Sequence, residues 1–343
     1  MSAASAQPST LFDHALRLHR LSPDQPLPNH GEPFPGEVEP VPRRRSREPS
    51  HLVGADVAAI IDLHVADPPA LADALRSVSA PIHRNDHIAA AALRADPDLV
   101  RSTGRWLVRR GTHRSAVAVG LALLAAGWDD EDVPLIRTAG LLSRAFGPLA
   151  SSALERRLGG EEALIWLGDR VADWGRVYVV EALCRVGGRA ARPWLLRRAV
   201  IGDALDVYYA GTVATAAHLH AAITAADVDD DLVDHTGRVL ATMADCEGRG
   251  TTLDAYPPAG PVLEAFLGYF TDQEPTVDRY LVAGQIAHHR PEHRDRVRAV
   301  LDRDDWCAAV RAHEGTSDLL TWFARAVAPG LGLKAFAGRA FEG

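Results

Sequence analysis

The sequence predicts an all-α protein built as a solenoid of stacked helix hairpins. From about residue 53 onward, apolar residues recur at helical spacing along almost the whole chain. Proline or glycine interrupts this pattern about every 10–20 residues, as expected at helix boundaries. No stretch shows the alternating β-branched residues typical of strands, and the sequence therefore gives no reason to expect a sheet.

The composition is that of a soluble globular protein. The chain has 343 residues, 47% hydrophobic and 24% charged, which is enough for two ordinary domains or one repeat array. The net charge of −8 argues against a phosphate backbone as the main partner. Lys334 is the only lysine, and the other basic residues are arginines, a bias that indicates a GC-rich bacterial genome. A cluster of arginines in this chain is therefore weaker evidence for a binding site than it would be in a chain of ordinary composition.

The cysteines and the N-terminus indicate a cytoplasmic protein. The three cysteines are far apart and form no C-x-x-C motif, so neither a disulfide framework nor a structural zinc site is expected. Residues 1–18 lack the continuous apolar core of a signal peptide. The longest apolar run, residues 116–128, is too short to cross a bilayer and predicts a buried helix. No cofactor and no membrane contact are expected.

The chain divides by composition into four parts. Leu11, Ala15 and Leu18 share one face of a predicted amphipathic helix. Eight prolines then follow within about 27 residues, and proline at this density prevents continuous helix or sheet. We therefore expect this linker, which ends in the basic run RRRSR, to lack regular structure and to pack poorly. The predicted parts are a short N-terminal helix (1–20), a proline-rich linker (21–50), a helical repeat domain (51–330) and a C-terminal tail (331–343).

Three blocks of the chain have the form of a helix end, a glycine-containing turn and a second helix. Residues 139–158 and 181–200 align at an offset of 42 residues, and residues 279–301 have the same form. One helix hairpin cannot bury its apolar faces alone, and stacking hairpins completes the core. On this pattern the chain, over about residues 52–330, resembles the HEAT-repeat (armadillo-like) α-solenoid family. The resemblance implies a long binding groove that needs no catalytic residues.

The clearest predicted helix begins at Asp173. It is apolar on almost every side, which indicates burial between neighbours. Gly187 should end it in the left-handed conformation, and Pro193 should fall in the first turn of the next helix. Glu181 lies one turn before Arg185, in the order that favours an ion pair.

Two histidine pairs are candidate metal ligands. His289, Glu292 and His293 spell H-x-x-E-H, the reversed zinc-protease motif. Pro291 lies between the two histidines, so they should belong to different helices and lose the required spacing. His83 and His87 form a second pair, for which capping of a helix by Asn85 or Asp86 is the simpler interpretation. No metal site is therefore predicted.

Two acidic runs precede predicted helices, at residues 129–132 and 227–234. Neither has the spacing of a calcium-binding EF-hand loop. Carboxylates at a helix N-terminus are stabilised by the helix dipole, which is the expected role of both runs.

One basic face is a candidate binding site. Arg101, Arg105 and Arg109 are four residues apart and form a ridge on a predicted helix. Basic residues beside an aromatic ring suit nucleic acid, and some HEAT-like helical proteins are DNA glycosylases that use such a surface. The alternative is that the ridge pairs with the acidic run at 129–132. The candidate binding residues are Arg101, Arg105, Trp106, Arg109, Arg110 and Arg114.

Two functions therefore remain from the sequence. The first is a non-catalytic scaffold that presents a groove to a protein partner. The alternative is a DNA-binding enzyme of the glycosylase kind that works through the ridge at residues 101–114. No catalytic residue matches a known motif: the chain has neither a P-loop nor a G-x-S-x-G elbow.

Overall fold

A computed structural model describes residues 9–36, 50–313 and 318–337. Twenty α-helices and several short 3-10 turns make up these ranges, which contain no strand. The prediction of an all-helical protein is therefore confirmed. None of the helices in these ranges has the length and apolar character needed to cross a bilayer.

The chain separates into two compact units, residues 1–191 and 192–343. The helices of the first unit are α1 (Leu11–Leu21), α2 (Ser50–His64), α3 (Pro68–Ala74), α4 (Asp86–Arg94), α5 (Pro97–Arg110), α6 (Arg114–Leu124), α7 (Val133–Gly140), α8 (Ser143–Leu154), α9 (Gly160–Gly168) and α10 (Asp173–Val186).

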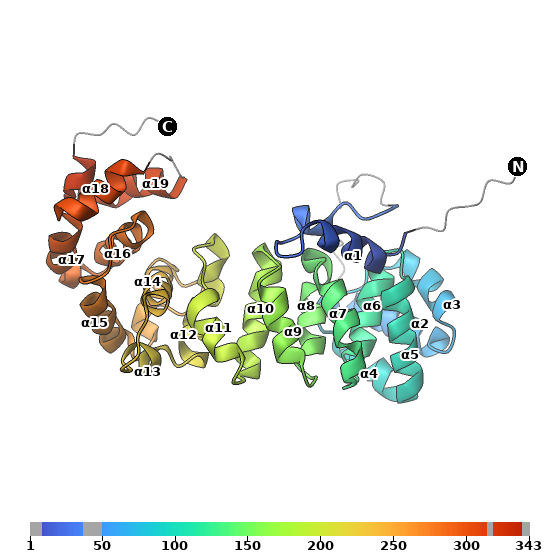
Figure 1. The fold of residues 1–343 in the computed structure, drawn as a ribbon. Helices are drawn as coiled ribbons and strands as arrows, with labels where there is room; N and C mark the ends of the chain where they lie inside the picture. The colour runs from blue at the N-terminus through green and yellow to red at the C-terminus, as the bar shows by residue number, and fades with distance from the viewer. Residues whose placement is uncertain (1–8, 37–49, 314–317, 338–343) are drawn as a thin grey trace, which may run out of the picture. The chain divides into compact units, whose positions relative to one another are not determined.

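The helices of the first unit form two layers (Figure 1). In one layer α2, α4, α6, α8 and α10 each contact the next, and in the other α3, α5, α7 and α9 do the same. The hairpins α5–α6, α7–α8 and α9–α10 connect the layers, and α1 packs on α5 and α7. Each helix is thus buried mainly by its close neighbours in sequence.

Small residues allow the helices of one hairpin to approach closely. A Cβ on Gly120 of α6 would lie 2.8 Å from Leu107 Cβ, and one on Gly104 of α5 would lie 3.0 Å from Leu124 Cγ. Leu107 and Leu124 are almost completely buried at this crossing. The apolar run at 116–128 is buried as predicted over most of its part in α6, residues 116–124, whereas Trp128 at its end is exposed. This crossing turns the polar side of α5 away from α6 and so positions the arginine ridge.

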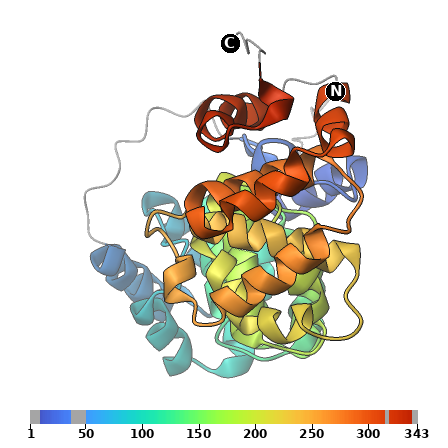
Figure 2. The same cartoon turned by 90° about the vertical axis from the view of Figure 1, so that its left-hand side faces the viewer.

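The second unit also has two layers. α11 (Ala191–Arg198) begins at the last residue of the first unit, and the others are α12 (Ala210–Ala216), α13 (Leu219–Ile223), α14 (Asp230–Ala244), α15 (Ala259–Phe270), α16 (Val277–His289), α17 (Arg294–Leu301), α18 (Asp304–Ala312), α19 (Asp318–Ala326) and α20 (Ala328–Leu331). α12, α14, α16 and α18 contact in series, and α13 contacts α15. The yellow-to-orange helices of this unit can be followed in Figure 2.

The expected 42-residue register is wrong in its first block. An offset of 42 residues from the turn at Gly187 predicts a turn near residue 145, but residues 145–148 lie inside α8, and the turn is at Leu141–Leu142. The alignment therefore paired α8 with α11, whereas α8 packs on α10. The hairpins beginning at Pro97, Val133 and Gly160 start 36 and then 27 residues apart, so their spacing is irregular.

Other predicted boundaries agree with the structure. α10 ends at Val186, and Gly187 takes the left-handed conformation with φ 59°. Pro193 lies in the first turn of α11. Both acidic runs supply helix caps: Asp129 accepts from Glu131 N, and Asp229 accepts from Leu232 N at the start of α14.

The prediction that the proline-rich segment packs poorly is wrong for residues 22–36. Phe34 is 3% exposed, stacks on Phe146 at 6.0 Å and lies under the guanidinium of Arg114. Leu27 is also buried, and Pro28–Gly31 forms a short 3-10 turn. Proline removes backbone donors but leaves side chains free to pack, which is what this segment does. The RRRSR run and the rest of residues 37–49 lie outside the described residues.

The expected C-terminal tail is also packed over residues 331–337. Phe336 contacts the rings of Tyr280 and Phe323 at 6.0 and 5.5 Å, and Ala335 is 2% exposed. The sequence showed only a glycine-rich stretch there, and long-range ring packing leaves no local pattern. Residues 338–343 lie outside the described part.

We expect Phe34→Ala to destabilise the first unit by about 3–5 kcal/mol, because it removes a buried ring from between Phe146 and Arg114. Urea denaturation followed by circular dichroism measures this. Leu21→Ala is the matched control, because Leu21 is 77% exposed and its loss should change stability by less than about 0.5 kcal/mol. Equal small effects from both variants would show that residues 22–36 add no stability.

Candidate functional site

The arginine ridge lies on α5, whose start is fixed by its sequence. Asp96 is the N-cap, with its carboxylate accepting from Asp98 N and Leu99 N at 3.0 Å, and Pro97 occupies the first turn. Gly111 follows the last residue of the helix. The ridge side chains project from the middle of this helix on the side away from the α6 crossing.

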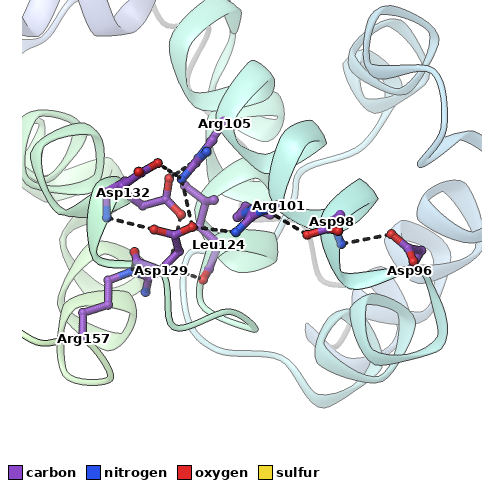
Figure 3. Close-up of polar contacts among 9 residues, drawn as sticks. Asp96, Asp98, Arg101, Arg105, Leu124, Asp129, Asp132 and Arg157 are labelled. Carbon is purple, nitrogen blue, oxygen red and sulfur yellow. Dashed lines mark hydrogen bonds and ion pairs between the residues drawn. The ribbon is translucent and has the colours of Figure 1, made fainter.

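Arg101 and Arg105 are paired with carboxylates (Figure 3). Arg101 donates to Asp98 at 2.8 Å and to Asp129 at 2.6 Å. Arg105 lies 3.2 Å from Asp129 and also donates from Nε to Asp132. The hydrogen bond to Asp132 raises the pKa of Arg105, whereas the Glu131 amide and then Arg101 lower the pKa of Asp129. The pairing of the ridge with residues 129–132, one of the two predicted alternatives, is confirmed for these arginines.

Behind this surface lies a buried arginine that the sequence analysis missed. Arg157 has no exposed side-chain surface and donates to the carbonyls of Leu124 at 2.6 Å, Ala153 at 2.5 Å and Asp129 at 3.0 Å. Its Nη2 lies 3.8 Å from Asp132 Oδ2. Burial lowers the pKa of Arg157, and the charge of Asp132 opposes that shift. Arg157 therefore ties together the chain segments that end α6, precede α7 and end α8.

The remaining ridge residues have separate surroundings. Trp106 is partly buried against the apolar core of α2 to α6, and Arg109 lies 5.2 Å from the ring of Phe12. Arg114 pairs with Glu32 at 2.9 Å, and Arg110 is exposed. The six predicted binding residues thus do not form one free basic face.

The candidate metal ligands are not brought together. α16 ends at His289, and Pro291–His293 forms a separate 3-10 turn, as predicted from Pro291. His289 lies 3.5 Å from Asp245, whereas His293 lies 3.8 Å from Glu264. In the described ranges no group of three or more histidine, cysteine or acidic side chains is placed to hold a metal ion.

The second histidine pair is at the start of α4. Asn85 caps this helix by accepting from His87 N at 3.1 Å, as predicted. His83 instead packs edge-on against the ring of Tyr178 at 5.4 Å. His83 therefore contributes to packing on Tyr178, and the backbone N–H of His87 takes part in the cap of α4.

One arrangement in the first unit has the residue types of a catalytic triad. Ser143 Oγ lies 3.5 Å from His30 Nδ1, and His30 Nε2 lies 2.8 Å from Asp173. Ser143 is only 2% exposed, and a Cβ on Gly175 would lie 2.4 Å from its Oγ. A hydroxyl covered in this way cannot meet a substrate. The contacts instead hold the proline-rich segment on α8 and α10.

Comparisons with known proteins give no further guide to the site. No family model matches the chain, and neither the curated proteins nor the solved structures include a significant match. The function is therefore inferred from the geometry of the chain itself.

We expect Asp132→Ala to destabilise the first unit by about 3 kcal/mol, because it removes the buried carboxylate that pairs with the buried Arg157. Chemical denaturation measures the change. Glu131→Ala removes a neighbouring carboxylate whose side chain is 82% exposed, and it should cost less than about 0.5 kcal/mol. Equal losses for the two variants would contradict a structural role for the buried pair.

Proposed function

We propose that the chain is a HEAT-like helical-repeat scaffold that binds a protein partner and has no catalytic role of its own. Support comes from the two helical layers, in which hairpins stack on their sequence neighbours. Such an array offers a continuous surface along its helix ends and outer faces. The irregular hairpin spacing fits a repeat family whose units are defined by packing more than by a fixed motif.

The observation that carries this proposal is a set of exposed apolar side chains at or just beyond the ends of neighbouring helices in one layer. Leu93, Trp128 and Leu158 are 77%, 65% and 82% exposed at the ends of α4, α6 and α8. Leu93 and the residues before Trp128 line one cavity of about 110 Å³, and Arg156 stacks on Trp128 at 4.2 Å. We call Leu93, Trp128 and Leu158 the apolar edge. Exposed aromatic and leucine side chains are frequent at protein-binding surfaces.

The charge arrangement favours a protein over nucleic acid as the partner. Arg101 and Arg105 already have carboxylate partners, and binding to a phosphate would have to break these pairs. The acidic residues around them, Asp98 and Glu131, are exposed and would repel a polyanion. The alternative of a glycosylase-like enzyme loses its main support when its basic ridge is neutralised.

We expect a partner captured by the wild-type protein from its native host to be lost with Trp128→Asp/Leu158→Asp. Both changes place a charge on the apolar edge without disturbing a buried side chain. Leu21→Asp is the matched control, because Leu21 is equally exposed at the end of α1. Purified partner should then bind wild type and control with the same affinity and the double variant at least about tenfold more weakly. Equal binding by all three proteins would rule out this edge.

We expect duplex DNA to bind weakly at physiological salt, and binding should change little with Arg105→Ala/Arg109→Ala. The reason is that Arg105 is neutralised and only a few arginines nearby remain exposed. A titration of affinity against salt concentration tests this, since each phosphate contact adds to the slope. Tight wild-type binding with a steep slope, abolished in the double variant, would refute the scaffold and support the glycosylase-like alternative.

A further inference from the structure

The second unit contains a half-enclosed cavity of about 220 Å³ between α14, α15 and α16. Phe266, Phe270 and Val282 supply its apolar side. The two phenylalanine rings stack at 5.8 Å, and Phe270 also packs on Trp306 at 4.8 Å, so the apolar wall is held in place from behind. An apolar wall combined with a few polar groups is the typical lining of a small-ligand site.

Glycine in α14 is required for this arrangement. A Cβ on Gly237 would lie 2.7 Å from the ring of Phe266 and 2.9 Å from Val282 Cγ1. Any side chain at position 237 would therefore push both apolar residues away. The absence of a side chain here lets α15 and α16 bring their apolar residues up to α14.

One polar wall of the cavity consists of side chains that pair with one another. Arg279 donates from Nε and Nη2 to the two oxygens of Asp234, at 2.7 and 2.9 Å, and also pairs with Asp230 at 3.0 Å. Gln273 Nε2 donates to the same Asp234 carboxylate at 3.1 Å. Asp234 therefore has little capacity left to bind a cation in the cavity.

Two other polar groups that line the cavity keep unused hydrogen-bonding capacity. Gln273 is 8% exposed, and its buried Oε1 has no hydrogen-bond partner. Arg238 donates from Nε to the carbonyl of Val200 at 3.3 Å and makes no ion pair within the described part of the chain. An unused buried acceptor is costly, and an arginine without a carboxylate favours an anion. Because Gln273 Oε1 is inaccessible from the cavity, Arg238 is the group left to recognise a ligand, and a carboxylate would satisfy it.

We propose that this cavity binds the C-terminal residue of a peptide, one with an aromatic or branched apolar side chain. The terminal carboxylate accepts hydrogen bonds from Arg238, and the side chain of that residue packs on Phe266, Phe270 and Val282. The inference rests on the proposed function, because a protein partner is what would supply such a terminus. A free apolar amino acid has the same chemistry and differs in its ammonium group, which would lie near the exposed Asp278.

Isothermal titration of the full chain with N-acetyl-phenylalanine, its carboxamide and free phenylalanine tests the proposal. The acid should bind saturably. The carboxamide should bind at least about tenfold more weakly, since it loses a charged hydrogen bond. Arg238→Gln should weaken the acid by a similar factor and leave the carboxamide unchanged. Arg296→Gln is the matched control, because Arg296 is 42% exposed, belongs to α17 and does not line the cavity. The acid–amide comparison on the wild type needs no variant and so does not depend on folding of Arg238→Gln.

Equal affinity for acid and carboxamide, or no saturable binding of either, would overturn the proposal. Tighter binding of free phenylalanine than of the N-acetyl form would also overturn it, and would identify an amino-acid site. These outcomes leave the capture experiment on the apolar edge unaffected, because that edge belongs to the first unit. Failure of the cavity and failure of the scaffold function are thus distinguishable.

Discussion

The first unit depends on one buried guanidinium. Arg157 satisfies carbonyl groups of Leu124, Ala153 and Asp129, which belong to three different chain segments. The ends of helices leave carbonyl groups without partners, and water cannot reach those that are buried. A single planar group with five donors contacts three carbonyl groups at once, two of which, those of Leu124 and Asp129, also accept from a backbone N–H. Asp132 balances its charge. The ion pairs on the surface, from Arg101 and Arg105, continue this network outward.

This network explains why the arginine ridge is a structural feature. Arg105 and Arg157 contact the same carboxylate, Asp132, from the exposed and the buried side. The exposed pairs contribute little each, but they keep the loop before α7 in the position that Arg157 needs. In contrast, Arg238 in the second unit has only a backbone acceptor among the residues that the structure describes. Arginine is abundant in this chain, and the residues that contact each one decide whether it is structural or available to a ligand.

The sequence predicted those features that are determined locally. The cap by Asn85, the glycine stop at Gly187 and the break at Pro291 depend on residues within one turn of helix. The pairing of Glu181 with Arg185, at 3.8 Å, has the same local origin.

The wrong expectations all concern contacts between distant residues. The 42-residue register failed because an apolar pattern does not say in which layer a helix lies. The burial of Phe34 depends on Phe146, more than a hundred positions later, and that of Phe336 depends on Tyr280. The unused hydrogen-bonding groups of Gln273 and Arg238 could not be predicted from the sequence for the same reason, since the cavity that they line forms only where three helices meet.

The anchoring of the proline-rich segment has a consequence for how the chain is made. His30 meets Ser143, a residue 113 positions later, and Asp173. Residues 22–36 are synthesised long before α8 and α10. Phe34 therefore has no partner ring to pack on until Phe146 has been made and folded into α8. Closing so long a loop is slow compared with forming a local hairpin. The segment that comes first in the chain is therefore among the last parts of its unit to reach its final place, and a nascent chain stopped before α10 would leave it undocked.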